Sequence, residues 1–152
     1  MSIVVVTGGF DPLHIGHIRH FESAKRLGDI LIVVLNTDKY LMKKKGYVFM
    51  PFEERKEIIE SIGCVDMVAR CIDTDQFQNK TLEALSRFFP GFIFAKGGDR
   101  TEEHMPESEI EICKQCGIKI VYGIGGGKIK SSQELVKNAN EVSRLRKNTD
   151  NK

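Results

Sequence analysis

The chain has 152 residues, of which 41% are hydrophobic and 29% charged, and its formal net charge is +2 at pH 7. This length lies near the commonest size of a single domain, and the composition is that of an ordinary globular protein, which excludes a disordered or fibrous chain. Because the 23 basic residues nearly balance the 21 acidic ones, the charge gives no general indication of binding to nucleic acid or to a membrane.

Apolar runs rich in β-branched residues alternate along the chain with segments of helical periodicity. The apolar runs predict five strands, over residues 3–7, 30–36, 65–71, 92–96 and 118–122. The periodic segments predict helices over residues 15–27, 51–62, 82–89 and 106–116, with a last helix beginning at Ser131. A basic loop is expected between the second strand and the second helix.

Strands that are apolar throughout and separated by helices are typical of a parallel sheet covered on both faces. We therefore predict an α/β fold, a single Rossmann-like doubly wound domain with a five-stranded parallel sheet. This domain is expected to span residues 1–146, and the polar residues 147–152 are expected to form a frayed tail.

The segments that follow the strands are the candidates for a ligand site, because ligands of such sheets bind at the carboxyl ends of the strands. Four of the five segments are rich in glycine, charge or hydroxyl groups, namely residues 8–17, 36–45, 96–100 and 123–132. We expect these four segments to converge on one rim of the sheet and to form a single site there.

The turn after the first strand contains the adjacent glycines Gly8 and Gly9, which allow close approach of backbone N–H groups to phosphate oxygens. Their spacing differs from the dinucleotide motif G-x-G-x-x-G. The later Gly127-Lys128-Ile129 is not a P-loop, because no glycine lies five residues before Gly127. Two common phosphate-binding motifs are thereby excluded.

Two histidines, His14 and His17, stand three residues apart at the start of the first predicted helix, with Gly16 leaving space between them. Imidazoles in this position can donate hydrogen bonds to phosphate oxygens during phosphoryl transfer. A lone histidine is more often a hydrogen-bonded core residue, but a pair beside a glycine-rich turn favours a function. We interpret His20 and His104 as structural.

The basic residues allow two interpretations each. Lys43, Lys44 and Lys45 either clamp phosphates or form an ordinary exposed run. Arg55 shares a helical face with apolar residues, so its guanidinium needs a structural acid or a ligand phosphate as partner.

Two later segments are also open to two interpretations. Asp99, after Lys96 and Gly98, either binds ribose hydroxyls or forms a tight turn. Ser131 fits a capping box with Glu134, and the nearby Lys130 favours an anion at the same helix terminus.

At Phe10-Asp11-Pro12-Leu13-His14-Ile15-Gly16-His17 the chain resembles the H-x-G-H nucleotidyltransferases. It is most similar to their cytidylyltransferase-like branch, which contains glycerol-3-phosphate cytidylyltransferases and heptose-1-phosphate adenylyltransferases. The resemblance extends from Val4 to about Leu135. It includes further blocks at residues 36–38, 51–55, 96–99 and 131–132.

The resemblance implies roles for three groups of residues. The catalytic residues would be His14, His17, Lys43, Lys45 and Asp11. The nucleotide would be bound by Gly8, Gly9, Phe10, Gly16, Lys96, Gly98, Asp99, Lys130, Ser131 and Ser132. The acceptor would be bound by Asp11, Asp38, Lys44 and Arg55. No side chain is predicted to ligate a metal, and Mg²⁺ is expected to bind mainly through the nucleotide phosphates.

The implied reaction transfers a nucleoside monophosphate from ATP or CTP to a phosphorylated small molecule and releases pyrophosphate. The Gly97-Gly98-Asp99 turn is more similar to the heptose-phosphate enzymes, which favours a sugar phosphate such as heptose-1-phosphate. Glycerol-3-phosphate is the alternative acceptor, although the arginine usual in those enzymes before the Ser/Thr pair is replaced here by Lys128 and Lys130. A homodimer is compatible with the resemblance, and no pattern in the sequence establishes it.

Two other classes of function remain to be compared. A non-catalytic nucleotide-binding sensor or assembly module would bind a nucleoside triphosphate without releasing pyrophosphate. An RNA-binding protein would need a broad basic face with exposed aromatic residues, and the chain has no tryptophan and only three tyrosines.

The chain shows neither a secretory signal nor an apolar run long enough to span a bilayer, so a cytoplasmic location is expected. Its cysteines are then expected to be reduced thiols. Cys113 and Cys116 form a C-x-x-C pair, but no second pair completes a tetrahedral zinc site. We interpret both as packing residues.

Overall fold

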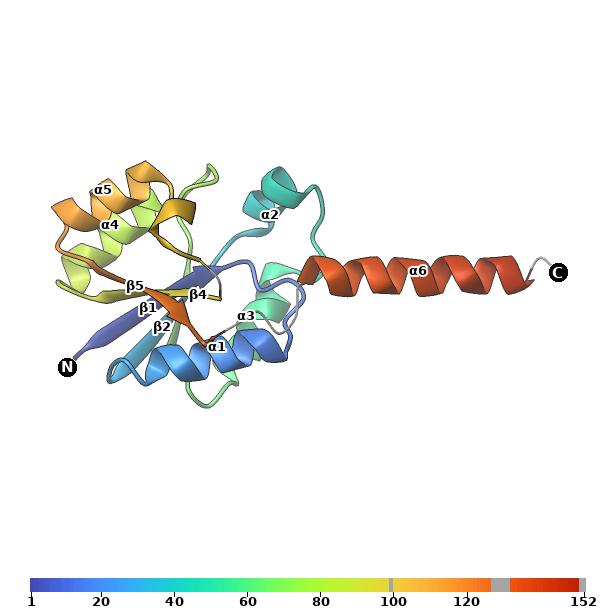
Figure 1. Cartoon of the computed structure of the whole chain (residues 1–152), viewed down its shortest axis with the longest axis horizontal. Helices are drawn as coiled ribbons and strands as arrows, with labels where there is room; N and C mark the ends of the chain where they lie inside the picture. Colours follow the sequence, from blue (N-terminus) through green and yellow to red (C-terminus); the bar gives the residue numbers. More distant parts are fainter. Residues whose placement is uncertain (99, 127–131, 151–152) are drawn as a thin grey trace.

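The computed structural model describes residues 1–98, 100–126 and 132–150, which form a five-stranded parallel sheet with helices on both faces (Figure 1). The strands are β1 (Ile3–Gly8), β2 (Ile30–Leu35), β3 (Met67–Arg70), β4 (Ile93–Gly97) and β5 (Lys119–Ile124), in the spatial order β3-β2-β1-β4-β5. The helices are α1 (Ile15–Lys25), α2 (Asp38–Lys45), α3 (Phe52–Glu60), α4 (Asn79–Phe88), α5 (Glu107–Gln115) and α6 (Ser132–Asp150), with a 3₁₀ turn η1 (Glu102–His104). The predicted fold class is confirmed.

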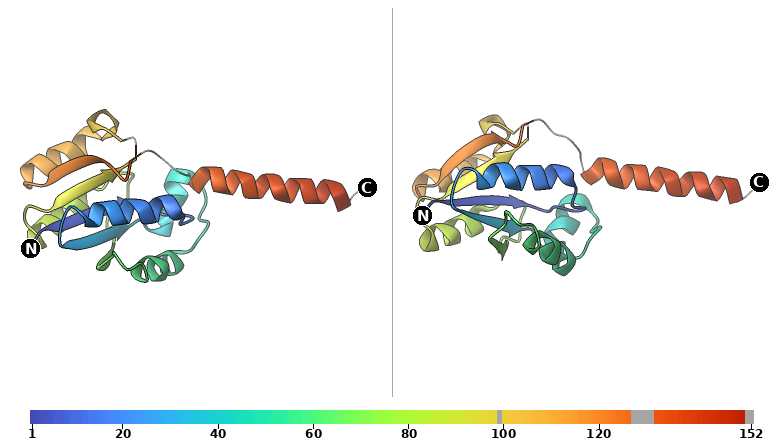
Figure 2. Two further views of the ribbon diagram at one scale, coloured as in Figure 1. Left: turned by 60° about the horizontal axis from the view of Figure 1, so that its bottom comes forward. Right: turned by 90° about the horizontal axis from the view of Figure 1, so that it is seen from below.

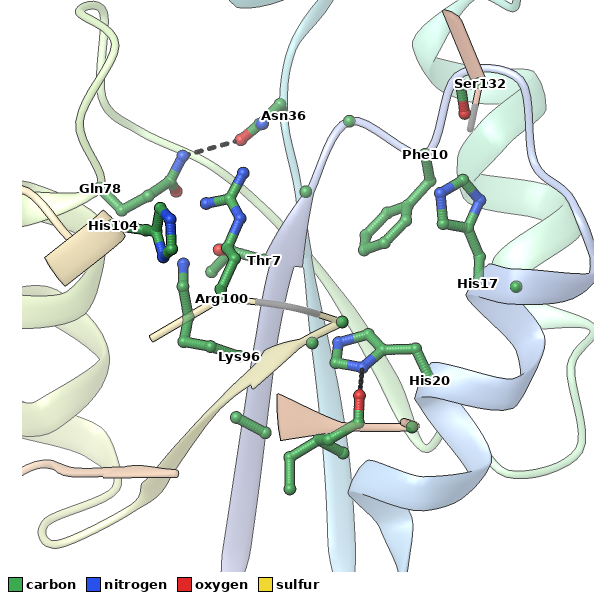
Figure 3. Close-up of a pocket in the computed structure, with 18 of the residues that line it drawn as sticks. Thr7, Phe10, His17, His20, Asn36, Gln78, Lys96, Arg100, His104 and Ser132 are labelled. Carbon is green, nitrogen blue, oxygen red and sulfur yellow. Dashed lines mark hydrogen bonds between the residues drawn. The ribbon is translucent and has the colours of Figure 1, made fainter. Parts of the chain in front are cut away.

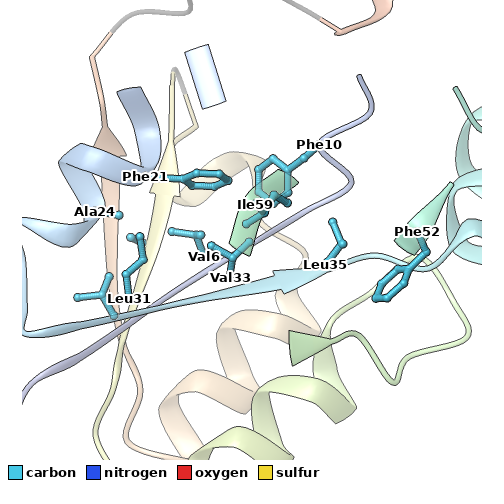
Figure 4. Close-up of a cluster of buried hydrophobic side chains, with 11 residues drawn as sticks. Val6, Phe10, Phe21, Ala24, Leu31, Val33, Leu35, Phe52 and Ile59 are labelled. Atoms are coloured by element: carbon cyan, nitrogen blue, oxygen red, sulfur yellow. The ribbon is translucent and has the colours of Figure 1, made fainter. Parts of the chain in front are cut away.

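Successive residues of the central strands point to opposite faces of the sheet, and both faces are buried. On one face, Val4 and Val6 of β1 pack with Phe21 of α1 and Ile59 of α3 (Figure 4). On the other face, Val5 packs in a second cluster with residues of α4 and α5, including Leu82 and Cys113. The apolar runs in the sequence are therefore continuous because each strand contributes to two cores.

The order of the strands reverses between β1 and β4. From β1 the chain proceeds outward through β2 to β3, then returns to place β4 on the other side of β1 and continues to β5. In open parallel sheets a ligand crevice forms at the carboxyl ends of the strands where the order reverses. The topology thus puts the ends of β1 and β4, at Gly8 and Gly97, beside this crevice.

The basic segment after β2 is a helix, α2, and the predicted loop is wrong. The Thr37 hydroxyl accepts a hydrogen bond from the Tyr40 N–H at the N-terminus, and Gly46 ends the helix with a φ of 82°. The lysines stand in the last turn, where positive charge is favourable. Helical periodicity did not reveal α2 because only Tyr40 and Leu41 among its residues are buried.

The last helix projects from the body of the molecule (Figures 1 and 2). From Lys137 to Thr149 every side chain is exposed, so only the first turns of α6 contact the domain. The helix includes residues 147–150, which the sequence assigned to a frayed tail, and the division into a domain and a tail stays a prediction. Among the residues that the structure describes, no helix is long and apolar enough to cross a membrane.

Candidate active site

A pocket of about 590 Å³ opens at the carboxyl ends of β1 and β4, where the strand order reverses. Residues from all four of the polar segments predicted by the sequence line it, from the β1–α1 turn, from the β2–α2 region, from the end of β4 and from the end of β5 with the start of α6 (Figure 3). Its described lining residues include four histidines and four other basic residues, Lys44, Lys45, Lys96 and Arg100. The single carboxylate among them is that of Glu109. The pocket therefore favours an anionic ligand.

The β1–α1 turn is held by the ring of Phe10. This residue has a φ of 49°, in the left-handed region, and its ring makes edge contacts with His17 and Phe21, at centroid distances of 5.0 and 4.9 Å. A Cβ on Gly8 would lie 2.8 Å from the tip of the Phe10 ring, and a Cβ on Gly9 would lie 2.6 Å from Leu41 Cδ2. The adjacent glycines thus allow the turn to pack tightly, and both line the pocket.

The two motif histidines are oriented by backbone N–H groups of their own segment. Nδ1 of His14 accepts a hydrogen bond from the Gly16 N–H at 3.0 Å, and Nδ1 of His17 accepts one from the His14 N–H at 3.3 Å. The two rings stack, with 3.8 Å between centroids. Because a neutral imidazole that accepts at Nδ1 carries its proton on Nε2, both rings are arranged as Nε2–H donors.

His17 is neutral at physiological pH. Burial lowers the pKa of His17 to about 3, and the neighbouring His14, His20 and Lys45 lower it further in the same direction. The ring therefore acts as a hydrogen-bond donor rather than as a cation until a polyanion binds beside it. Figure 3 shows it on the same side of the pocket as Phe10 and Ser132.

The Asp11 carboxylate is fully buried and lies outside the pocket lining. Its two oxygens accept hydrogen bonds from the N–H groups of Phe49, at 2.7 Å, and Met50, at 2.6 Å. These contacts fasten the segment before α3 to the β1–α1 turn. Asp11 thereby supports the site, and the geometry gives no support to the direct contact with acceptor predicted for it.

Arg55 is likewise fully buried, and protein groups account for its hydrogen bonds. Its guanidinium donates to the carboxylate of Asp38 at 2.6 Å. It also donates, at 2.8 Å each, to the carbonyl oxygens of Met50, Gly9 and Asn36. Of the two partners considered for Arg55, the structural acid is present, and neither Arg55 nor Asp38 lines the pocket. The predicted acceptor contacts of this pair therefore have no geometric support, because each is engaged with the other.

The three lysines of α2 do not act as one group. Lys44 and Lys45 line the pocket. Lys43 is exposed outside it, and its Nζ lies 3.5 Å from the carbonyl oxygen of Thr74. Consecutive helical residues are rotated by about 100°, so three lysines in a row cannot face one site.

Three of the remaining predicted residues come from the start of α1, the turn after β4 and the start of α6. Gly16 and Gly98 line the pocket, and Gly98 has a φ of 65°. Ser132 also lines it, and its hydroxyl donates to the carbonyl oxygen of Pro12 at 2.8 Å, which ties the start of α6 to the β1–α1 turn. Asp99, Lys130 and Ser131 lie outside the described residues.

The sequence-based reasoning missed several residues that line the pocket. His20 lies one turn after His17, with Nδ1 3.3 Å from the Ile124 carbonyl oxygen and with Gly97 packed against its ring. Its spacing from His17 was a usable signal. Asn36, Tyr40 and Arg100 lie inside the predicted segments 36–45 and 96–100 but were not singled out there, and His104, interpreted as structural, also lines the pocket. Gln78 and Glu109 come from segments that carried no signal.

The described part of the chain contains no group of three or more His, Cys, Asp or Glu side chains arranged to hold a metal ion. Cys113 is buried in the core with Cys116 packed against the same cluster. Burial, together with the Glu109 carboxylate, raises the pKa of Cys113 to about 11, which disfavours a thiolate. The C-x-x-C pair therefore packs the core.

Comparisons with known proteins support the family resemblance seen in the sequence. A family model described as cytidylyltransferase-like matches residues 5–147. A bifunctional protein HldE of Syntrophotalea carbinolica is 36% identical over 104 residues, which are 67% of this chain and 20% of that protein. A glycerol-3-phosphate cytidylyltransferase of Bacillus subtilis is 44% identical over 68 residues, which are 45% of this chain and 53% of that enzyme.

A solved structure extends the similarity to three dimensions. The crystal structure of the lipopolysaccharide core biosynthesis protein from Thermoplasma volcanium matches with a TM-score of 0.62 at 27% identity, over 80% of this chain and 95% of that one. The chain itself spans between a fifth and about half of the length of the two relatives matched by sequence.

Proposed function

The chain belongs to the cytidylyltransferase-like family, and on this premise we propose that it transfers a nucleoside monophosphate from ATP or CTP to a phosphorylated small molecule. The observation that carries the proposal is the pair of stacked histidines at the N-terminus of α1. Both Nδ1 atoms are occupied by backbone N–H donors, which leaves Nε2–H as the donor of each ring. Two such donors beside a cation-rich pocket are suited to a phosphate whose negative charge grows during the reaction.

The reaction is an in-line displacement. An oxygen of the acceptor phosphate forms a bond to the α-phosphorus, the bond from that phosphorus to the bridging oxygen breaks, and pyrophosphate leaves with the electron pair. His17 donates a hydrogen bond to the phosphates as a neutral ring, and Lys45 supplies positive charge nearby. Catalysis then depends on positioning two polyanions and neutralising their charge.

The nucleotide is assigned to the side of the pocket formed by α1, the end of β4 and the start of α6. Gly8, Gly9, Phe10, Gly16, Gly98 and Ser132, all in the lining, support this assignment. Gly97 and Gly125 pack closely against His20. The groups nearest the base of the nucleotide would therefore be backbone atoms rather than side chains. Asp99, Lys130 and Ser131 belong to the same proposal on the strength of the motif alone.

Magnesium would accompany the nucleotide phosphates. Glu109 supplies the single carboxylate among the described lining residues, and one carboxylate does not form a metal site by itself. The ion would therefore be held through phosphate oxygens, where it neutralises charge on the leaving pyrophosphate.

A sugar phosphate such as heptose-1-phosphate is the proposed acceptor, and glycerol-3-phosphate is the alternative. The similarity to HldE covers more of this chain than the similarity to the glycerol-3-phosphate enzyme, 67% against 45%. The turn Gly97-Gly98-Asp99, which is more similar to the heptose-phosphate enzymes, also favours a sugar phosphate.

The test measures pyrophosphate release with Mg²⁺, ATP and CTP in separate reactions, and a panel of sugar 1-phosphates and glycerol-3-phosphate. We expect release that requires one nucleotide and one acceptor and that is lost in His17→Asn. Clear nucleotide binding without release for any pair would contradict the transferase and favour the non-catalytic sensor.

A further inference from the structure

The side of the pocket opposite the histidines contains the largely buried ammonium group of Lys96. Lys96 is 8% exposed, and in the described structure its Nζ makes no hydrogen bond or ion pair, only a contact with the Phe94 ring at 4.5 Å. Figure 3 shows it across β1 from His17, pointing toward Gln78. A charge in such a largely buried position is stabilised by an anion, so a ligand anion in the pocket would pair with it.

Two further cations adjoin Lys96. Burial lowers the pKa of Lys96 to about 8, and Arg100 and Lys44 lower it further while Glu109 opposes them. The side chains of Arg100 and Lys44 are more exposed and stand at the mouth of the pocket. Three neighbouring cations that repel one another in this way form a site for an anion with several oxygens.

A carboxylate lies beside the three cations. Glu109 of α5 is 4% exposed, and one of its oxygens accepts the Gln78 N–H at 3.0 Å, while the other has no hydrogen bond among the described residues. The Gln78 side chain is fixed in turn by donating to Asn36 at 3.0 Å. A rigid carboxylate oxygen facing a pocket is an acceptor for a hydroxyl group.

Lys44 and Lys45 connect this side of the pocket with the histidines. Lys45 is near enough to His17 to lower the pKa of that ring, and Lys44 is near enough to Lys96 to lower the pKa of that ammonium. An anion at Lys96 and Lys44 would therefore lie next to a phosphate bound at His17 and Lys45. This is the arrangement that two reacting phosphates require.

We propose that Lys96, Lys44 and Arg100 bind the phosphate of the acceptor and that Glu109 accepts a hydrogen bond from one of its hydroxyl groups. The acceptor class is then a phosphorylated polyhydroxy compound. This inference rests on the proposed function for its reaction, and it moves Lys96 from the nucleotide, to which the sequence assigned it, to the acceptor.

The first experiment needs no turnover. Binding of inorganic phosphate is measured by calorimetry with Mg²⁺ and the α,β-methylene analogue of ATP or CTP filling the nucleotide side. We expect Lys96→Met to weaken phosphate binding at least ten-fold and to change the affinity for the analogue less than two-fold. Lys119→Met, at the exposed start of β5, is the matched control and should change neither.

A second pair of variants separates the carboxylate from the cations. Glu109→Gln should raise the KM for the hydroxylated acceptor several-fold without weakening the binding of inorganic phosphate, with the exposed Glu107→Gln as control. Arg100→Gln, an exposed position, should weaken phosphate binding about three-fold and serves if Lys96→Met does not fold.

The outcomes distinguish the two proposals. Phosphate binding that depends on Lys96, with no pyrophosphate release for any acceptor, supports the subsite and contradicts the proposed function. Turnover with an unchanged acceptor KM in Lys96→Met overturns the subsite and leaves the proposed function standing. Weaker analogue binding with unchanged phosphate binding, or no phosphate binding by the unmodified protein, also overturns it.

Discussion

The two sides of the pocket are built in different ways. On the histidine side, the orienting contacts of His14 and His17 are made within residues 14–17, by backbone N–H groups close in sequence. On the opposite side, Lys96 comes from β4, Gln78 from the segment before α4 and Glu109 from α5, and the contacts between them join residues far apart in the chain. The first side is a local motif, whereas the second exists only after the sheet has assembled.

This difference predicts that the two sides respond differently to mutation. A local motif keeps its geometry when distant packing changes, because its hydrogen bonds close within one helical turn. An assembled site depends on the contacts that hold several segments together. Four measurements test this difference, beginning with a substitution of the buried Arg55.

Replacing Arg55 should have the largest effect. Arg55→Met removes the guanidinium that joins Gly9, Asn36 and Asp38, and it takes this donor away from the carbonyl oxygens of Gly9 and Asn36 and from the Asp38 carboxylate. We expect a loss of about 3–5 kcal/mol in the free energy of unfolding, measured in denaturant. The exposed pair Lys56–Glu60 provides the control, since Lys56→Met should cost less than about 1 kcal/mol. An equal loss in both variants would show that the buried network contributes little.

His17→Asn should come next, with its effect on turnover rather than on folding. The asparagine amide oxygen can replace Nδ1 as acceptor for the His14 N–H, but no donor remains at the position of Nε2. We expect kcat to fall by about 10²–10³, equivalent to about 2.7–4 kcal/mol, with an unchanged unfolding midpoint. His17→Gln, whose amide reaches the Nε2 position, should recover part of this loss. Full activity of the folded asparagine variant would remove His17 from the reaction.

Gly9→Ala should destabilise the turn by about 1–3 kcal/mol, because its Cβ would lie 2.6 Å from Leu41 Cδ2. Leu41 belongs to α2, so the displacement would pass to the helix that carries Lys44 and Lys45. Gly63→Ala is the control, since a Cβ there meets no atom within 4 Å. Denaturant unfolding of both variants measures the difference, and similar values would show that Leu41 adjusts freely.

The last prediction is a pH dependence of stability caused by His17. Its pKa in the folded protein is about 3, below the ordinary value of 6.5, so the unfolded chain binds the proton more readily between these values. The stabilisation is complete above about pH 6.5 and is lost as the pH falls toward 3, by at most about 1.4 kcal/mol per pH unit. The stability of the wild type relative to His17→Gln should therefore decrease as the pH is lowered from 7 to 5. Parallel curves would mean that His17 titrates normally.

The fold class and the histidine side of the pocket could be predicted from the sequence alone. The apolar runs identified all five strands. The strands β1, β2 and β4 are buried on both faces and must be apolar there, whereas the edge strands β3 and β5 are only partly buried. His14, Gly16 and His17 were recognised as a unit because their contacts close within four consecutive residues, as a capping box at the N-terminus of α1. The helix α2 was missed although Thr37 and Gly46 mark its ends, since its exposed lysines show no apolar periodicity.

Charged residues with a structural role could be distinguished from those that face the pocket only in the folded protein. Arg55 and Lys96 were both candidate ligand-binding cations in the sequence. Arg55 donates to Asp38 and to three carbonyl oxygens, whereas Lys96 has no hydrogen-bond acceptor among the residues that the structure describes. Glu109 and Gln78 had no signal, because their roles depend on a contact across 31 residues of chain. The partners of a buried charge are set by the packing of distant segments, and residue spacing carries no information about them.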